Sequence, residues 1–355
     1  ISFVCPRPVL SYKLSPTGTV LEKKIAGRYS SWFQRLQLRF ADLGVSHFTE
    51  SVHEEITHRI YGCMKEAEQC GDVDIDYASP YVLAGVRWND DPPFLLHSGE
   101  GRNTSCKVTE TVRFSTQPKC WYQLFRDAER RTANKEFLDA SSKASLLARS
   151  HFGDLQFIHA MASKNKEPAS ETKKRIMMWA EFTWKVSRGD YVLETQLKNT
   201  LIEGFDGFFG RYDWRVQDLF ALGNPDLRMG IKDVAFGSLL HMVQDSFASG
   251  HVERTGFGET CPSVTPYMAA GRIREFHFYA GQDASKHGEY DRRNAFFNHL
   301  DSARPTVVDV GQALLEYRSR NSIPPWNEVK PYVDCIFSVA DAQAEASPGD
   351  GFRRD

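Results

Sequence analysis

Apolar residues recur at helical spacing along most of this sequence. In residues 52–64, Ile56, Ile60 and Met64 lie four positions apart and would share one face of an amphipathic helix. Residues 171–187 show the same periodicity, and a shorter apolar run over residues 81–93 ends at two prolines. Similar patterns predict helices over residues 121–148, 236–254, 284–298, 306–319 and 326–344. Alternating patterns typical of strands are few, so the sequence predicts an all-α fold, although residues 188–230 give no clear assignment.

The composition is that of an ordinary globular protein. The chain has 355 residues, of which 41% are hydrophobic and 25% charged, and its formal net charge is −2. This charge and the absence of basic clusters argue against a stable nucleic-acid partner. No apolar run reaches the ~18–20 residues that a membrane-spanning helix needs, so we expect no transmembrane segment. The sequence begins without Met, which suggests that a leader has been removed and that the protein is secreted or periplasmic.

The seven cysteines are scattered and include no C-x2-C pair, which argues against a zinc site built from cysteines. Cys63 and Cys70 lie seven residues apart, and Cys106 and Cys120 flank a polar loop. Both pairs would suit disulfides in an oxidising compartment. Buried reduced thiols fit the same pattern, and the odd count would leave one thiol over.

The most informative segment is FGSLLHMVQDSFASGHVER, residues 236–254. It carries His241, Asp245 and His251 at the spacing H-x3-D-x5-H. Residues i and i+4 share a helix face, so His241 and Asp245 would project together, and Gly250 would let the backbone turn before His251. Two imidazoles and a carboxylate gathered in this way are typical zinc ligands. A structural His–Asp pair with a separate surface histidine is the alternative.

Further acid and imidazole groups surround this segment in the sequence. His53 begins a predicted helix, Asp90 ends another, and His151 follows a third. His287 and Asp291 are again four residues apart on a predicted helix. Any one of these pairs could arise by chance, but their number favours a metal site.

The order of these groups resembles the superfamily of zinc-dependent phospholipases C and secreted fungal zinc nucleases, with the bacterial phospholipase C branch closer. The matching elements are His53-x2-Ile56, Gly85-x4-Asp90, Ser150-His151-Phe152-x-Asp154, Leu240-His241-x3-Asp245-x5-His251 and His287-x3-Asp291. The central element is the most specific of the five. The resemblance implies a multi-helix bundle, here with long inserted loops, that holds a cluster of three zinc ions.

The same resemblance implies a role for each residue. One zinc would be held by Asp90, His151, His241 and Asp245, a second by His251, His287 and Asp291, and a third by His53 and the shared Asp245. Asp90 would also orient or deprotonate the attacking water, as the catalytic residue. Phe152 would line the substrate pocket or, equally, pack in the core.

The implied activity is that of a phospholipase C. Such an enzyme uses a metal-bound hydroxide to cut the glycerol–phosphate ester of a phospholipid at a membrane surface, giving diacylglycerol and a phosphorylated head group. A single-strand nuclease or 3′-nucleotidase with the same cluster is the alternative. A non-catalytic helical protein with structural His–carboxylate pairs is a third hypothesis, from another class.

Several features depart from the family pattern. An N-terminal arm, residues 1–45, precedes the predicted all-helical domain at 46–345 and a flexible tail at 346–355, so the family's N-terminal Trp ligand is missing and His47 is a candidate replacement. Ser249 stands where the family usually has proline. His159 competes with His151 for one ligand position, and Asp91 with Asp90. The other histidines, His58, His97, His277 and His299, are expected at the surface.

Overall fold

The computed structural model describes residues 51–64, 70, 77–96, 105–210, 213–256, 258–261, 264, 266–290, 292–302 and 305–354. The predicted N-terminal arm, His47, His97 and Asp291 lie outside these residues. The described part of the chain is mostly helical, with about 51% helix, which confirms the predicted predominance of helices.

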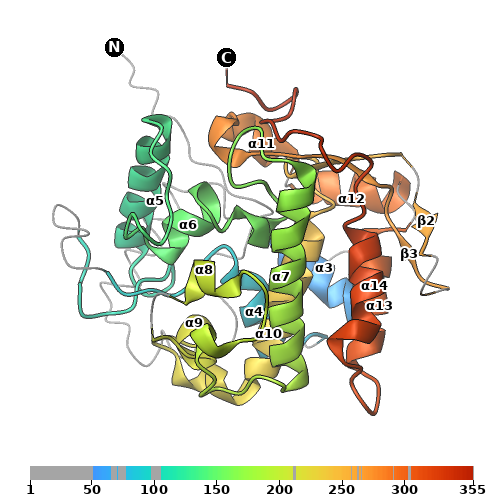
Figure 1. The fold of residues 1–355 in the computed structure, drawn as a ribbon, viewed down its shortest axis with the longest axis horizontal. Coiled ribbons are helices and arrows are strands. Elements are labelled where there is room, and N and C mark those ends of the chain that lie inside the picture. The colour runs from blue at the N-terminus through green and yellow to red at the C-terminus, as the bar shows by residue number, and fades with distance from the viewer. Residues whose placement is uncertain are drawn as a thin grey trace.

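The helices are α3 (Val52–Ile60), α4 (Pro80–Trp88), α5 (Pro118–Ala133), α6 (Leu146–Phe152), α7 (Ala169–Arg188), α8 (Phe205–Phe209), α9 (Val216–Phe220), α10 (Ile231–Asp245), α11 (Ala284–Tyr290), α12 (Arg293–Ser302), α13 (Val307–Arg318) and α14 (Trp326–Ile336). Short 3-10 turns are η1 (Gln156–His159), η2 (Leu197–Asn199), η3 (Pro225–Gly230) and η4 (Tyr279–Gly281). Figure 1 shows the long helix α7 running beside α10, with α13 and α14 to one side and α5 and α6 to the other.

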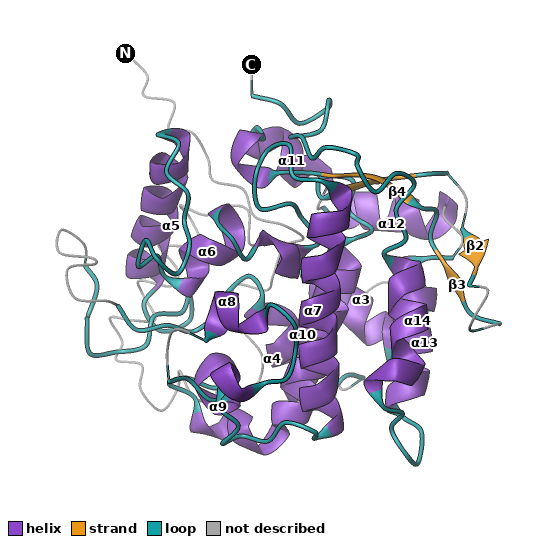
Figure 2. Ribbon diagram, in the orientation of Figure 1, coloured by secondary structure: helices purple, strands orange, loops and turns teal. Residues whose placement is uncertain are grey.

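Two small antiparallel ribbons interrupt the helices, and the all-α prediction did not include them (Figure 2). Strand β1 (Val252–Arg254) pairs with β4 (Ile273–Phe276), and β2 (Glu259–Thr260) pairs with β3 (Met268–Ala269). Strands this short carry too few residues for an alternating pattern to be recognised in the sequence.

Several of the predicted helices differ from the observed ones. The helix predicted over residues 236–254 ends at Asp245 and its last three residues form β1, residues 284–298 contain α11 and part of α12, and the helix predicted over residues 326–344 ends at Ile336. The helix predicted over residues 52–64 ends at Ile60, because Gly62 adopts a positive φ of 104° that a continuing helix cannot contain. The stretch 121–148 contains two helices, since α5 ends at Ala133 and α6 begins after Ser145, whose hydroxyl caps the new helix by accepting from the Ala148 amide.

Helix α10 lies at the centre of the described structure and is buried from Val234 to Asp245. It packs most extensively on α4 and α7. Glycines make the contact with α4 unusually close, because a Cβ at Gly85 would lie 2.0 Å from the Val234 carbonyl oxygen and a Cβ at Gly237 2.1 Å from that of Val82. This backbone-to-backbone packing brings the C-terminal end of α4 against the face of α10 that carries His241.

Three disulfides and the contacts of the C-terminal segment join parts of the chain outside the central helices. Disulfides join Cys63 to Cys70, Cys106 to Cys120 and Cys261 to Cys335, so six of the seven cysteines are paired. The segment predicted as a tail lies against the body over residues 346–354. Its Phe352 is buried and accepts a hydrogen bond from the Asp283 amide through its carbonyl oxygen. Among the described helices, none is long and apolar enough to cross a membrane.

Candidate metal centre

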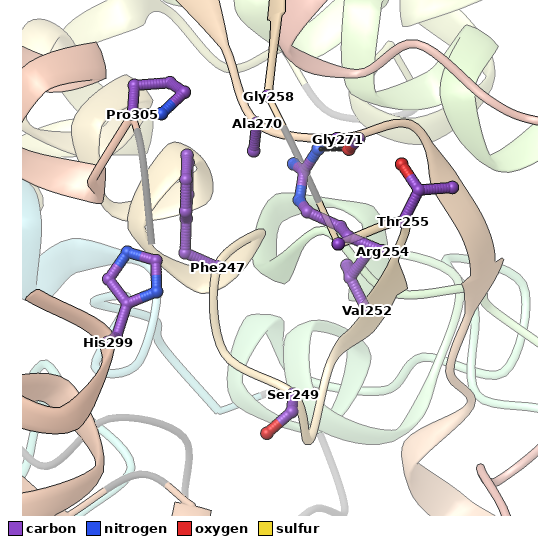
Figure 3. Close-up of a pocket in the computed structure, with 11 residues that line it drawn as sticks. Phe247, Ser249, Val252, Arg254, Thr255, Gly258, Ala270, Gly271, His299 and Pro305 are labelled. Carbon is purple, nitrogen blue, oxygen red and sulfur yellow. Dashed lines mark hydrogen bonds between the residues drawn. The ribbon is translucent and has the colours of Figure 1, made fainter. Parts of the chain in front are cut away.

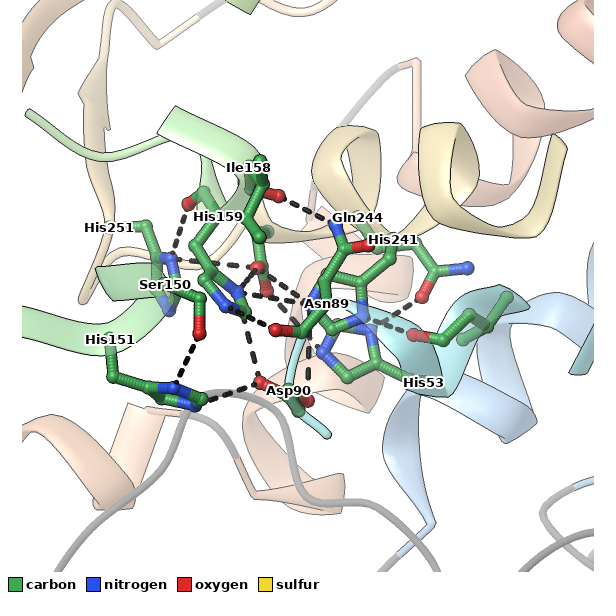
Figure 4. Close-up of polar contacts among 12 residues, drawn as sticks. His53, Asn89, Asp90, Ser150, His151, Ile158, His159, His241, Gln244 and His251 are labelled. Atoms are coloured by element: carbon green, nitrogen blue, oxygen red, sulfur yellow. Dashed lines mark hydrogen bonds and ion pairs between the residues drawn. The ribbon is translucent and has the colours of Figure 1, made fainter. Parts of the chain in front are cut away.

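Side chains from five separate elements meet at the buried end of α10 (Figure 4). Helix α10 supplies His241 and Asp245, one turn apart as predicted. The other contributors are His53 on α3, Asp90 just after α4, His151 on α6 and His159 on η1. All six are at most 5% exposed, so their polar atoms depend on one another for partners.

Asp245 lies at the centre of this cluster, with histidines around its carboxylate. Its Oδ2 lies 2.8 Å from His159 Nδ1 and 3.0 Å from His241 Nε2, and its Oδ1 lies 3.4 Å from His53 Nε2. His251 Nδ1 is 3.9 Å from the same Oδ2. One carboxylate therefore touches or faces four imidazoles, which is the position expected of a bridging ligand.

Asp90 occupies a second position facing the histidines. Its Oδ1 lies 3.7 Å from His151 Nε2 and 3.8 Å from His159 Nδ1, and its Oδ2 lies 3.9 Å from His241 Nε2. At these separations neither carboxylate oxygen makes a hydrogen bond within the described residues, although both are buried. A buried carboxylate with no hydrogen bond is costly, and a cation at this point would remove the cost.

The imidazoles are oriented by hydrogen bonds to groups behind them. His241 Nδ1 donates to the Val86 carbonyl at 2.6 Å, and His159 Nε2 donates to the Asn89 carbonyl at 3.1 Å. Because a carbonyl oxygen can only accept, the proton is fixed on that nitrogen and the other nitrogen of each ring faces the carboxylates. The same arrangement around metal-binding histidines fixes the tautomer and ring orientation.

Two further histidines have an Nδ1 that is oriented by an oxygen, although in His251 this same Nδ1 is the atom that lies near Asp245. His53 Nδ1 lies 2.6 Å from the side-chain oxygen of Gln244, while the Gln244 amide nitrogen donates to Thr57 at 2.9 Å. Thr57 in turn donates to the His53 carbonyl, so the chain of donors places the Gln244 oxygen toward His53. His251 Nδ1 donates to the His159 carbonyl at 2.8 Å.

The protonation of the cluster reflects competition between burial and the two carboxylates. Burial alone lowers the pKa of His53, but hydrogen bonding to Asp245 and the charges of Asp245 and Asp90 outweigh it and raise this pKa to about 9. Burial alone raises the pKa of Asp245, but the charges of His241 and His251 and its hydrogen bonds with His159 and His241 hold it well below its usual range. Burial likewise raises the pKa of Asp90, but the charges of His241 and His159 outweigh it and lower this pKa, so both carboxylates are ionised and available to a cation.

His151 and His159 both reach the site, although the sequence treats them as rivals. His159 belongs to the tighter group, since its ligand nitrogen lies within 4.8 Å of ligand atoms of Asp90 and His241. His151 sits on the other side of Asp90, where Ser150 and the Leu147 carbonyl engage its Nδ1. The local sequence around His159 gives no metal-binding signal, because its approach depends on a turn closed by Ala160 at the unusual φ of 53°.

His287 lies at the edge of the cluster, next to His251. Their ring centroids are 5.0 Å apart, and His287 is fully buried. A Cβ at Gly250 would lie 2.8 Å from His287 Nδ1, so Gly250 provides space for this ring. Asp291, the remaining predicted ligand, lies outside the described residues.

Two neighbouring carboxylates, those of Asp91 and Asp154, form hydrogen bonds with groups outside the cluster. Asp91 accepts from the Phe114 amide at 2.9 Å, and Asp154 forms two hydrogen bonds of 2.8 Å with Arg149. Phe152, which the sequence predicts either to line the substrate pocket or to pack in the core, is buried, and the centroid of its ring lies 4.9 Å from that of Phe125.

Two of the histidines expected at the surface are buried. His58 accepts from the Ala78 amide, and His277 Nδ1 donates to the Gly250 carbonyl at 3.1 Å. The surface prediction was wrong for both, because each ring satisfies a backbone group in the interior.

Comparisons with protein-family models, curated proteins and solved structures find no match to this chain. The donor set itself is therefore the guide to chemistry. Two overlapping groups, His53 with His241 and Asp245, and Asp90 with His159 and His241, each have ligand atoms close enough to hold a metal ion. Imidazole nitrogens mixed with carboxylate oxygens and no thiolate fit zinc and other divalent transition metals.

Proposed function

We propose that this protein is a zinc-dependent phosphodiesterase that acts on phospholipids as a phospholipase C. One observation supports this most strongly. Two buried, ionised carboxylates, Asp90 and Asp245, face imidazoles whose opposite nitrogens are held by carbonyl or amide oxygens. That arrangement is suited to holding more than one cation in a small space. The family resemblance in the order of these residues points to the same chemistry.

We assign the ligands from the observed distances. Asp90, His159, His241 and Asp245 would hold one zinc, with His151 as a further or alternative ligand beside Asp90. His53 and Asp245 would hold another. The third, with His251, His287 and Asp291, is assigned from the family resemblance alone, because Asp291 lies outside the described residues. When bound, zinc lowers the pKa of a coordinated water to near neutrality and stabilises negative charge on a phosphate.

The protein's own groups prepare the site for that role. Asp245 brings a full negative charge to the position between His53 and His241, and its low pKa means that no proton competes for it at neutral pH. Because each tautomer is already fixed, the imidazole rings do not have to reorient when a metal ion binds. Asp90 Oδ1 and Oδ2 have no hydrogen-bond donor within the described residues, so this carboxylate can accept a proton from, or orient, an attacking water.

Lipid is preferred to nucleic acid as the substrate on the basis of charge. Nucleic-acid enzymes usually carry a basic surface that neutralises several phosphates, whereas this chain has a net charge of −2 and no basic cluster in its sequence. Attraction of a phosphate would then come mainly from the metal ions. A phospholipid presents one diester at a time, which such a local site can bind.

The proposal can be tested with two assays on protein purified without chelator. Elemental analysis should find zinc, and phosphatidylcholine vesicles should be hydrolysed to diacylglycerol. Zinc near zero would favour the non-catalytic alternative and refute the enzyme. Hydrolysis of single-stranded DNA with none of lipid would replace the phospholipase by a nuclease that uses the same cluster.

A further inference from the structure

A separate cavity of about 190 Å³ lies beyond the end of α10, on the side of the loop that leads into β1 (Figure 3). It is bordered by Phe247, Val252, Ala270 and Pro305, which give it apolar walls, and by the guanidinium of Arg254. The hydroxyls of Ser249 and Thr255 add polar groups. Its volume is below the ~300–1,000 Å³ of pockets for drug-sized ligands, so its ligand would be small.

Arg254 is held firmly, but only by neutral oxygens. Its Nε and Nη2 donate to the carbonyl and hydroxyl of Ser246 at 2.8 and 2.9 Å, and its Nη1 donates to the carbonyls of Gly271 and Ile336 at 3.0 and 2.9 Å. These bonds use four of the five N–H donors of a guanidinium. One N–H on Nη2 is left for another acceptor.

The positive charge of Arg254 has no counter-charge among the described residues. Within the part of the chain that the structure describes, no carboxylate forms an ion pair with Arg254, and the neighbouring Glu253 is directed instead toward Arg274. The ring of Phe247 lies 5.0 Å from the guanidinium and offers only a weak cation–π contact. Burial lowers the pKa of Arg254 to about 9, which still leaves it cationic at neutral pH. A partly buried cation beside an apolar cavity gains from an anion placed there.

We propose that this cavity binds a small organic carboxylate, with its anionic group on Arg254 and its short apolar tail against Phe247, Val252 and Ala270. A single N–H and a single charge match a monoanion, and the apolar walls favour a ligand with a hydrocarbon part over an inorganic ion. The site shares no residue with the metal cluster and is independent of the proposed function.

Butyrate is a suitable probe, with the neutral analogue 1-butanol as its control. Binding to the full-length chain as purified can be followed by saturation-transfer NMR and isothermal titration calorimetry. Butyrate should bind at least about tenfold more tightly than 1-butanol, because loss of a charge-assisted hydrogen bond costs about this much. Arg254→Gln should remove this difference.

A second variant keeps the test decisive if Arg254→Gln does not fold. Ala270→Phe fills the cavity and leaves the hydrogen bonds of Arg254 intact, so it should abolish butyrate binding, whereas Ala342→Phe at an exposed site should not. Equal binding of butyrate and 1-butanol, or no binding of butyrate, would overturn the proposal. Butyrate binding that survives Ala270→Phe would place the ligand elsewhere, for example on the metals, and would overturn it as well.

Discussion

Replacing Asp245 by Asn is the sharpest perturbation of the candidate metal centre. Asparagine has nearly the same shape, so the change removes the charge of a fully buried carboxylate without creating a cavity. It acts on the two contacts of 3.0 Å or less, to His159 and His241, and on His53 at 3.4 Å. The effect should therefore appear in two separable quantities, the stability of the metal-free protein and the affinity for zinc.

The stability of the metal-free protein should fall first. Breaking a buried ion pair by removing one partner typically costs about 3–5 kcal/mol, because the remaining charge is left without compensation. Here the remaining charge is that of His53. Burial lowers the pKa of His53, but the hydrogen bond to Asp245 and the charge of Asp245 outweigh this effect and raise the pKa to about 9. His53 can partly escape the cost by losing its proton, so we expect the lower end of that range.

The affinity for zinc should fall further. Changing a residue that only supports a metal ligand commonly costs about 10–100-fold in affinity. Asp245 is proposed as a direct ligand shared by two ions, so we expect at least about 100-fold, equivalent to about 2.7 kcal/mol. The proposed phospholipase activity should be lost with the metal.

Thermal or denaturant unfolding with excess zinc and with EDTA separates the two effects. In EDTA, the difference between Asp245→Asn and the unchanged protein reports the ion pair alone, and in zinc it should grow by the lost binding energy. Asp233→Asn, on the first turn of the same helix and about 39% exposed, is the matched control and should keep its zinc. If the difference is the same in zinc and in EDTA and the zinc content is unchanged, Asp245 is not a ligand and the reasoning fails.

Other changes test the remaining parts of the structure. His159→Gln should lower zinc content more than His151→Gln, as measured by elemental analysis, because His159 lies in the tighter group of ligand atoms; the opposite order would support the sequence-based choice. Gln244→Met should weaken zinc binding about 10–100-fold in a chelator competition, since His53 loses the acceptor that orients it, whereas unchanged affinity would show that this contact is dispensable. Gly85→Ala should destabilise the fold by about 1–3 kcal/mol in urea unfolding, because the new Cβ would meet the backbone of the adjacent helix. The control Gly207→Ala, with open space around it, should be close to neutral. Equal effects of the two substitutions would contradict the close packing of α4 on α10.

The parts of the fold and site that were predictable are those set by local spacing. The four-residue interval between His241 and Asp245 places both on one helix face wherever that helix packs. The helical periodicity of α7 and α13 likewise survives in the structure with bounds within two residues of those predicted. Patterns of this kind depend on backbone geometry alone.

What could not be predicted depends on contacts between distant segments. His159 comes within 2.8 Å of Asp245 across 86 residues, through a turn whose left-handed residue is an alanine rather than a glycine. The burial of His277 depends on its contact with Gly250, which belongs to a different segment. Sequence spacing carries no information about either approach.

The hydrogen bonds that orient His241 and His159 come from the backbone of α4 and not from additional side chains. Val86 and Asn89 lie in the last turn and at the C-cap of α4, and the carbonyls near a helix end have few partners within the helix. The close contact of α4 with α10 at Gly85 brings these carbonyls directly behind His241 and His159. Backbone atoms thus fix two ring orientations that no side-chain substitution can remove. The orientation of His53, by contrast, rests on the side chain of Gln244. Substitution behind the rings should therefore disturb the His53 position most, and leave the Asp90–His241 side of the centre able to retain a metal ion.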